Sequence, residues 1–337
     1  MIVRAKVHPE ARNTQEGTSK PFRRFLVVRN PVSTNAHTAV RRIADLERSF
    51  PDMECAVIET LPGGREANAA LLRPFAKKLG KDTLLCIAGG DGTINMVLET
   101  LLNDMKLSEE ARRTPILPLW GGNANDLAHM LNGRAKRANL PKLVASDEVV
   151  KVFPLVCSMT DTSGNVVVRL AACYASFGAS AISTLELSKQ TARAHIPLSR
   201  IPLLRFMWEL LIVIPAMSQS PTFTTSEDGK SRSVYEHVIF NGPRFAKITG
   251  VKRKLTDQTF HRVVVEQKRL SDLLTFAGAL TRPKQAAKFE TTHTEFTVLE
   301  GTWAQFDGEA MRVYAGTHIT VTVGTVPFYA LSNRVQK

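Results

Sequence analysis

Cysteine is scarce in this sequence, and the spacing of the few cysteines does not indicate a disulfide or a metal site. The four cysteines stand in apolar surroundings without a CxxC pattern, at Cys55, Cys86, Cys157 and Cys173. We expect them to be small buried side chains in a reducing compartment, with neither disulfides nor zinc. The histidines are scattered without metal-ligand spacing, so none is assigned a function.

Long apolar runs are also missing. The most hydrophobic stretch, residues 201–217, is interrupted by Arg205 and Glu209, which makes it too short and too charged to span a bilayer. It is expected to be either a buried helix or one wall of a lipid-binding or membrane-docking surface. Residues 1–21 are polar and lack the apolar segment of a signal peptide, so a flexible tail and a cytoplasmic location are expected.

Acidic residues are in the minority. The chain has 31 Asp and Glu against 44 Lys and Arg, a formal net charge of +13. This excess favours an anionic partner such as a nucleotide or an acidic membrane surface. The basic runs, at 134–142 and 244–254, lack interleaved aromatic residues and zinc spacings, so nucleic acid is not expected as a partner.

Two rhythms of apolar residues divide the chain. Up to residue 147, strand patterns near 25–29, 54–58, 83–88 and 115–119 alternate with helical patterns near 36–49, 65–79, 93–105 and 123–132. This alternation predicts a parallel sheet covered on both faces. After residue 147, short β-rich runs beginning with 149–156 predict an antiparallel domain with helical insertions near 180–217 and 270–280.

The most informative segment is residues 84–95, where an apolar run is broken by three glycines around Asp91 and then resumes as a helix. Such glycines can let backbone N–H groups approach a phosphate at a helix N-terminus, although many α/β proteins use them only for packing. A carboxylate inside a phosphate-binding loop favours a divalent cation or a proton-transfer role. The loop lacks the lysine of a Walker A motif.

Two other polar loops follow predicted strands. Residues 30–34 come after the first strand, and residues 120–126 come after the strand near 115–119. Because loops at successive strand ends meet at one edge of an open α/β sheet, we expect the three loops to form one site.

Four motifs occur in an order shared with one family: Asn30-Pro31-Val32-Ser33, Gly89-Gly90-Asp91-Gly92-Thr93, Gly122-Asn123-Ala124-Asn125-Asp126-Leu127-Ala128 and Asp307-Gly308-Glu309. On these motifs the chain resembles the diacylglycerol kinase catalytic-domain family, which includes bacterial lipid kinases and sphingosine and ceramide kinases. The resemblance implies an α/β nucleotide-binding domain and a C-terminal antiparallel β-sandwich, with the active site in the cleft between them. We place the first domain at 22–147, with 325–337 as a candidate to complete it, and the lipid-substrate domain at 148–324.

The resemblance also implies a set of site residues. Asp91 would hold Mg²⁺ or assist proton removal, Glu309 would be the proton acceptor, and Asp307 belongs to the same catalytic motif. The expected ATP-binding residues are those of the three loops, to which the resemblance adds Thr60 and Asn123: Asn30, Pro31, Ser33, Thr34, Thr60, Gly89, Gly90, Asp91, Gly92, Thr93, Asn95, Gly122, Asn123, Asn125 and Asp126.

Simpler structural roles remain open for two of these motifs. Asp307-Gly308 between two β-like runs is a typical hairpin turn. Asn125 or Asp126 could cap a helix by accepting its first free N–H groups. The chain also departs from the family at Thr34 and Met96, and Trp120-Gly121 resembles an insertion, so the loop geometry is expected to differ.

The expected activity is an ATP- and Mg²⁺-dependent transfer of phosphate to a hydroxyl of a diacylglycerol-like or sphingoid lipid. This places the protein in lipid metabolism and phospholipid biosynthesis, bound peripherally to an anionic membrane surface, with a homodimer as a candidate assembly. One rival is a kinase of a soluble acceptor, since NAD kinases share a GGDG loop. Another is a catalytically silent protein that binds lipid or nucleotide.

Overall fold

The computed structural model describes residues 22–61, 65–104, 108–122, 124–133, 139–193, 202–245, 248–249, 254–266 and 290–333. The expected tail at 1–21, Asn123, most of the basic residues at 134–137 and 246–253 and the expected helix near 270–280 lie outside these residues. The chain divides into two compact units, residues 1–153 with 326–337 and residues 154–325. No helix in the described part of the chain is both long and apolar enough to cross a membrane.

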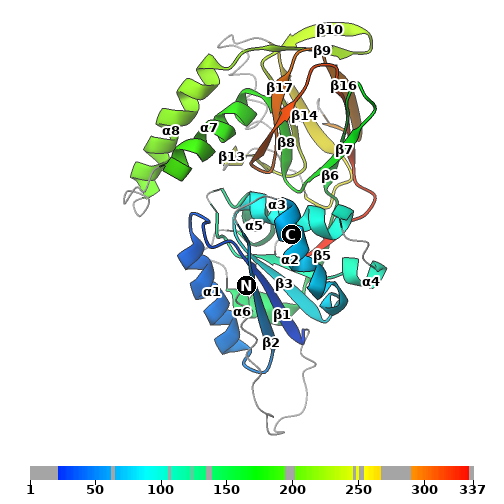
Figure 1. Ribbon diagram of the computed structural model, residues 1–337. Helices are drawn as coiled ribbons and strands as arrows, with labels where there is room; N and C mark the ends of the chain where they lie inside the picture. The colour runs from blue at the N-terminus through cyan, green and yellow to red at the C-terminus, as the bar shows by residue number, and fades with distance from the viewer. Residues whose placement is uncertain are drawn as a thin grey trace. The chain divides into compact units, whose positions relative to one another are not determined.

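The first unit is built on a six-stranded sheet in the order β2-β1-β3-β4-β20-β5 (Figure 1). Its strands are β1 (Arg24–Arg29), β2 (Glu54–Glu59), β3 (Thr83–Ala88), β4 (Pro115–Pro118), β5 (Val149–Val152) and β20 (Phe328–Leu331). All neighbouring pairs are parallel except β20 and β5. Every residue of β3 is buried, as expected for a central strand covered on both faces.

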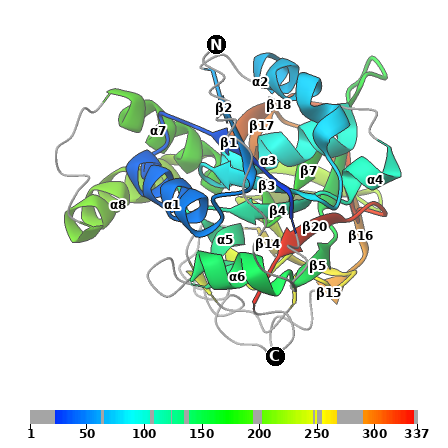
Figure 2. The same ribbon diagram turned by 90° about the horizontal axis from the view of Figure 1, so that it is seen from below.

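Helices cover both faces of this sheet. They are α1 (Ala36–Ser49), α2 (Arg65–Leu72), α3 (Asp91–Glu99), α4 (Glu109–Arg112), α5 (Asp126–Asn132) and α6 (Leu140–Ser146), with short irregular turns at Arg73–Lys78 and Thr100–Asp104. Phe25 and Val27 of β1 pack with Ile43 of α1 and Leu143 of α6. Figures 1 and 2 show α1 and α6 on one side of the sheet and α2 on the other. The predicted α/β architecture is therefore confirmed.

The boundary between the units differs from the one predicted from the sequence, because β5 and β20 belong to the first sheet. The run expected as one strand at 149–156 is two: β5 joins the sheet of the first unit, and β6 (Leu155–Thr160) joins the second. The boundary accordingly falls after Phe153 instead of after residue 147. Strand β20 is also fastened to α5, because Asn132 Nδ2 donates to the Leu331 carbonyl at 3.1 Å and Ser332 Oγ donates to the Leu131 carbonyl at 2.8 Å.

The second unit contains two six-stranded antiparallel sheets, β10-β9-β16-β19-β6-β7 and β15-β14-β11-β8-β17-β18. Besides β6, their strands are β7 (Val166–Ala171), β8 (Tyr174–Gly178), β9 (Phe223–Glu227), β10 (Lys230–Val234), β11 (Glu236–Phe240), β14 (Phe260–Val265), β15 (Glu290–Thr291), β16 (His293–Val298), β17 (Thr302–Phe306), β18 (Glu309–Val313) and β19 (His318–Val323). A small ribbon pairs β12 (Arg244–Phe245) with β13 (Ile248–Thr249). Phe177 and Phe306 from one sheet and Phe296 from the other share one core, so the predicted β-sandwich is confirmed.

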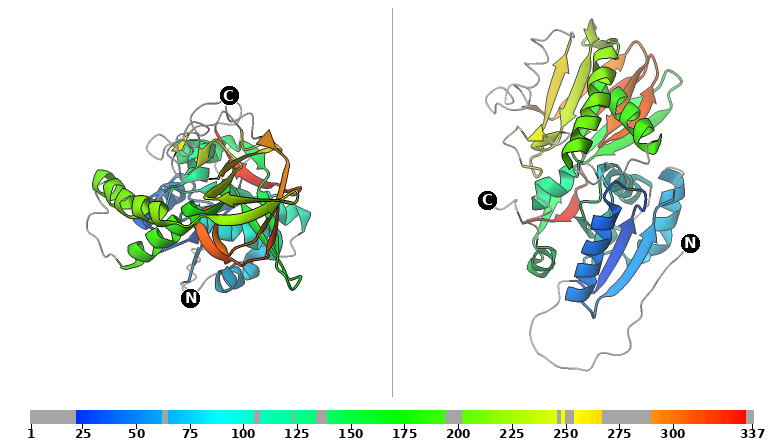
Figure 3. Two further views of the ribbon diagram at one scale, coloured as in Figure 1. Left: turned by 90° about the horizontal axis from the view of Figure 1, so that it is seen from above. Right: turned by 90° about the vertical axis from the view of Figure 1, so that its left-hand side faces the viewer.

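Two helices, α7 (Ala179–Arg193) and α8 (Pro202–Gln219), lie side by side in this unit (Figure 3). The expected helix at 201–217 is α8, and it is not buried all round. Met207, Leu211 and Ile214, spaced four and three residues apart, are 50%, 72% and 58% exposed. Residues with this spacing share one face of a helix, so α8 presents an apolar stripe to solvent.

Candidate kinase site

Three loops of the first unit begin where β1, β3 and β4 end, and these strands are neighbours in the sheet. Asn30 follows β1, the Gly89-Gly90 pair follows β3, and the Gly121-Gly122 pair begins three residues after the end of β4. Because the strands are parallel, all three loops lie at the carboxyl edge of the sheet, where open α/β folds bind ligands.

Hydrogen bonds tie the first loop to the other two. Ser33 Oγ donates to the Gly121 carbonyl at 2.5 Å, and Asn35 Nδ2 donates to the Gly122 carbonyl at 2.6 Å. Asn30 Nδ2 reaches the other way and donates to Thr93 Oγ1 at 3.0 Å. The three loops therefore form one connected cluster, which we call the loop cluster (residues 30–35, 89–93, 121–122 and 124–126).

The two glycine pairs pack directly against each other. A Cβ atom added to Gly122 would lie 2.2 Å from the Cα of Gly90, and one added to Gly121 would lie 2.8 Å from the backbone nitrogen of Gly89. No side chain fits at such distances. The packing role considered for the glycines from the sequence is therefore present, and it joins the second loop to the third.

Asp91 forms the second bridge between these loops. Its carboxylate is buried and accepts the backbone N–H groups of Asp126 at 3.0 Å and Leu127 at 3.2 Å. These N–H groups open α5, so Asp91 caps a helix that begins 35 residues further along the chain. A negative charge at this end of a helix is also favoured by the helix dipole.

Asn125, one of the two expected caps of α5, does not act as a cap. Asn125 stands at the cap position with a left-handed backbone, φ 53°, but its side chain makes no capping bond. Its amide instead bonds to both backbone groups of Gly122, at 2.8 Å each. Asp126 is fully buried as the first residue of the helix. The capping role expected of Asn125 is therefore wrong, because its side chain bonds to Gly122 and the Asp91 carboxylate accepts the first N–H groups of α5.

Of the remaining predicted nucleotide-binding residues, some belong to the loop cluster and others lie on neighbouring elements. Pro31 and Thr34 are exposed in the first loop, and Gly92 and the buried Asn95 belong to α3. Thr60 directly follows β2, the strand beside β1, and its N–H donates to the Arg29 carbonyl at 2.8 Å. Asn123 lies outside the described residues.

Asn35 and Gly121 belong to the loop cluster but are absent from the sequence-based set of site residues. The repeated doublet, Gly121-Gly122 after Gly89-Gly90, is the signal that could have identified Gly121. Asn35 gives no such signal, because its role depends on a contact 87 residues away.

The DGE motif lies in the second unit, on the hairpin between β17 and β18. Asp307 and Gly308 form its two-residue turn with φ values of 49° and 90°, as an Asp-Gly hairpin requires. The carboxylate of Asp307 is buried and accepts the N–H groups of Ala172, Cys173 and Tyr174 at 2.6, 2.9 and 2.9 Å. The hairpin reading is thus correct, and Asp307 also fastens this turn to the β7–β8 connection.

Glu309 is the first residue of β18, and its side chain is 34% exposed. A carboxylate oxygen lies 3.3 Å from the guanidinium of Arg169 on β7, whose own side chain is 13% exposed. Glu309 therefore stands partly in solvent with the Arg169 guanidinium against it.

Two neighbouring residues of β11 are buried titratable groups. Glu236 accepts the Ser180 N–H at 2.7 Å and the Ser180 hydroxyl at 2.6 Å, and Ser180 in turn contacts Gln305 at 3.0 Å. Burial raises the pKa of Glu236 to about 8, although the hydrogen bonds from Ser180 act in the opposite direction. The network ties α7 to the sheet that contains β8 and β17.

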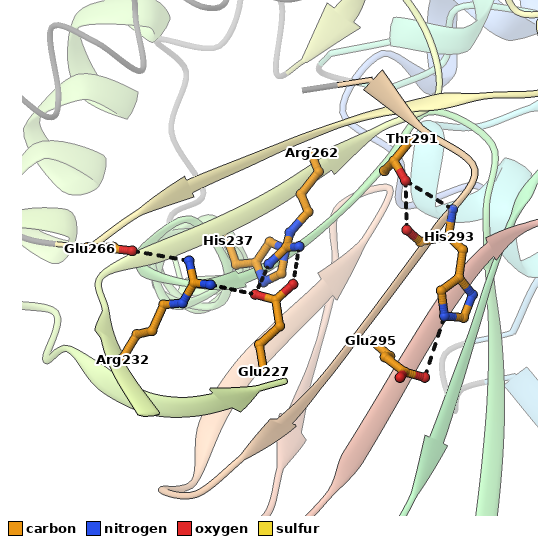
Figure 4. A network of polar contacts seen from close by, with 8 residues as sticks. All are labelled: Glu227, Arg232, His237, Arg262, Glu266, Thr291, His293 and Glu295. Atoms are coloured by element: carbon orange, nitrogen blue, oxygen red, sulfur yellow. Dashed lines mark hydrogen bonds and ion pairs between the residues drawn. The ribbon is translucent and has the colours of Figure 1, made fainter. Parts of the chain in front are cut away.

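Figure 4 shows the surroundings of the other group, His237. Arg262 Nε donates to His237 Nε2 at 3.0 Å, and the same guanidinium pairs with Glu227. Burial and the charges of Arg262 and Arg232 hold the pKa of His237 well below its usual value. His237 is therefore a neutral acceptor inside the sandwich.

Known proteins similar to this chain include kinases of two kinds. Residues 24–153 match the family model of the diacylglycerol kinase catalytic domain. A crystal structure of a diacylglycerol kinase from Bacillus anthracis str. Sterne is similar with a TM-score of 0.61 and 17% sequence identity, over 94% of this chain and 99% of that one. Yeast NADH kinase in complex with NADH is similar with a TM-score of 0.50 and 12% identity, over 93% of this chain and 84% of that one.

No curated protein matches the chain. At identities this low the two solved structures show a shared fold, and the match to the family model is confined to residues 24–153. Residues 24–153, which contain the loop cluster, are therefore the part of this chain that is similar to the diacylglycerol kinase catalytic domain.

Proposed function

We propose that this protein is an ATP- and Mg²⁺-dependent kinase that phosphorylates a hydroxyl group of a diacylglycerol-like or sphingoid lipid. The observation that carries the proposal is the loop cluster, in which three family motifs are fastened together at one sheet edge. Backbone N–H groups at such an edge, with the N-terminus of α3 among them, suit a triphosphate.

Several loop residues would bind the nucleotide. Gly89 to Asn95, with Asn30, Ser33 and Thr34, would contact the phosphates, and Thr60 and Asn123 would contact the rest of ATP. The hydrogen bonds within the cluster support this role, because a preformed loop loses less conformational entropy when the ligand binds.

Mg²⁺ would enter with the nucleotide. The described residues contain no group of three or more His, Cys, Asp or Glu side chains that could hold a metal by themselves. A magnesium ion on ATP needs only one or two protein carboxylates, and Asp91, buried in the loop cluster, fits that requirement. Bound there, the ion would neutralise charge on the phosphates.

The transfer step requires a proton acceptor, which we assign to Glu309. The oxygen of the acceptor hydroxyl forms a bond to the γ-phosphorus of ATP while the bond from that phosphorus to the bridging oxygen breaks. ADP leaves with the electron pair, and the hydroxyl proton passes to the Glu309 carboxylate. Asp307 would shape the turn that presents Glu309.

Two features support a lipid acceptor at a membrane surface. Helix α8 exposes Met207, Leu211 and Ile214, which suits contact with acyl chains. The net charge of +13 suits an anionic bilayer. A soluble acceptor is the second candidate, supported by the fold shared with yeast NADH kinase.

A labelled-phosphate assay tests the proposal. Purified protein is incubated with γ-labelled ATP, Mg²⁺ and either lipids in mixed micelles (diacylglycerol, sphingosine, ceramide) or soluble NAD and NADH. We expect label in an extractable lipid only when Mg²⁺ is present. Label in NAD or NADH would favour the second candidate, and no transfer to any acceptor would overturn the kinase proposal.

A variant pair tests the proton acceptor. We expect Glu309→Gln to lower kcat by roughly two to four orders of magnitude, because an amide cannot take up the proton. Glu295→Gln is the matched control, since Glu295 is an exposed glutamate of β16. Full activity of the Glu309 variant would remove this residue from the mechanism.

A further inference from the structure

Arg169 is the cation beside the proposed proton acceptor, and contacts with a ring, a sulfur atom and Glu309 itself hold it in place. The Arg169 guanidinium carbon lies 5.2 Å from the centroid of the Phe306 ring, and Nη1 lies 3.4 Å from the sulfur of Met311. The third contact is the 3.3 Å pair with Glu309. Because the side chain is 13% exposed, this arginine is a mostly buried residue of β7 and not a solvated surface charge.

The ring that carries the guanidinium is itself fixed. Phe306 is fully buried and meets Phe177 edge to face, with ring centroids 6.2 Å apart. A planar guanidinium stacked on an immobile ring loses less freedom when it pairs with a carboxylate than a flexible ammonium does. Arg169 is therefore oriented before it meets Glu309.

The turn that precedes Glu309 is held by residues that follow β7, the strand of Arg169. β7 leads into Ala172–Tyr174, whose three N–H groups bind the Asp307 carboxylate two residues before Glu309. Asn241 Nδ2 donates to the Ala172 carbonyl at 3.0 Å and holds this connection. The end of β7 thus fixes the turn, and its Arg169 contacts the side chain that follows the turn.

From this arrangement we infer that Arg169 is a positioning residue that holds the Glu309 carboxylate in one orientation for proton transfer. The inference rests on the proposed function, in which Glu309 accepts the proton. A glutamate has three rotatable side-chain bonds, and a general base must lie within about 3 Å of the proton that it removes. Loss of Arg169 would remove a charged contact that restricts the rotamers of this partly exposed carboxylate.

Steady-state kinetics of Arg169→Met test the inference, because methionine keeps the apolar stem and removes the guanidinium. We expect kcat to fall about 10- to 100-fold while the KM for ATP changes by less than about threefold. In the Glu309→Gln background the same substitution should cause no further loss, since Arg169 acts only through Glu309. Arg312→Met is the control. Arg312 lies on β18, the strand of Glu309, and its guanidinium stacks on the ring of Trp303 from β17.

Arg169→Lys covers the case in which the methionine variant is poorly folded, as judged by its thermal midpoint. It keeps the charge but not the planar stack, and we expect it to lower kcat roughly 3- to 30-fold, again only when Glu309 is present. Unchanged kcat in Arg169→Met would overturn the inference. So would a further loss in the double variant, which would mean that Arg169 contacts substrate directly.

The failure of the proposed function gives a different result. Full activity of Glu309→Gln alone removes Glu309 as proton acceptor, whatever Arg169 does. An inactive Glu309→Gln together with a fully active Arg169→Met leaves the proposed function in place and overturns only the positioning role.

Discussion

At the scale of single residues, Asp91 is the side chain that joins two family motifs. It belongs to the loop after β3, yet its carboxylate accepts the first N–H groups of α5, the helix that follows the loop after β4. The position is thus required structurally, and any contact with a metal ion would be an additional role.

This contact predicts the effect of Asp91→Asn on stability. The amide nitrogen cannot accept a hydrogen bond, and the charge that favours the helix N-terminus is lost, so we expect a decrease of about 1–3 kcal/mol in the free energy of unfolding. Urea denaturation measures the change. Asp45→Asn on α1, where the carboxylate makes an exposed pair with Arg48, should change stability by less than about 0.5 kcal/mol. Equal midpoints for the two variants would contradict the capping role.

Part of the site could be predicted from single residues and part could not. The glycine doublets and the polar residues after each strand identify the loops, because parallel strands bring their carboxyl ends to one edge. The bond from Asp91 to Leu127 and that from Asn35 to Gly122 join residues 36 and 87 positions apart. Local sequence carries no signal for such pairs, since they depend on how two loops pack.

At the scale of helices and strands, the periodicity of apolar residues predicts whether a segment is a helix or a strand better than it predicts the sheet to which a strand belongs. Helix α1 has the expected bounds, whereas residues 149–156 look like one strand and are two. Apolar alternation cannot show that the chain leaves one sheet at Phe153 and enters another at Leu155. Strand β8 is fully buried like β3, but Ser176 and Gly178 interrupt its apolar residues, so it shows neither alternation nor a continuous apolar run.

Helix α8 carries the element-scale prediction. Leu211, the most exposed residue of its apolar stripe, should enter the acyl region if this helix docks on a bilayer. We expect Leu211→Glu to weaken binding to vesicles of anionic phospholipid by about tenfold, because the transfer of one large apolar side chain is lost. Vesicle co-sedimentation measures the effect.

Val40→Glu on α1 is the control for this experiment, since Val40 is also an exposed apolar residue of a helix, at 41%. Both variants should unfold at the same midpoint as the unaltered protein. If Val40→Glu weakens vesicle binding as strongly as Leu211→Glu, the loss reflects added negative charge and not the α8 stripe.

At the scale of the whole molecule, two adjacent residues of β11 shape the dependence of stability on pH. Between pH 4.5 and about 8, Glu236 keeps its proton in the folded protein and loses it on unfolding, so stability falls as pH rises. Below pH 6.5, the unfolded chain binds a proton at His237 that the folded protein does not, so stability falls as pH decreases.

Between about pH 4.5 and 6.5 these two contributions to the free energy of unfolding have opposite slopes, so the dependence on pH should be weakest there. Above pH 6.5 stability should decline towards pH 8 by up to about 1.4 kcal/mol per pH unit. Denaturant titrations of the full chain at a series of pH values test this. Glu236→Gln should remove the alkaline decline and Glu295→Gln should keep it; a decline that persists in the first variant would exclude Glu236 as its source.

The position of β20 in the sheet has a consequence for the order of events during synthesis. Strand β5 pairs with β20, and the last turn of α5 is tied to residues 331 and 332. A ribosome must therefore translate all of the second unit before β20 can take its place between β4 and β5 in the first sheet. Until then β4 keeps an unpaired edge in the nascent chain, and this interval is when a chaperone would have most to protect.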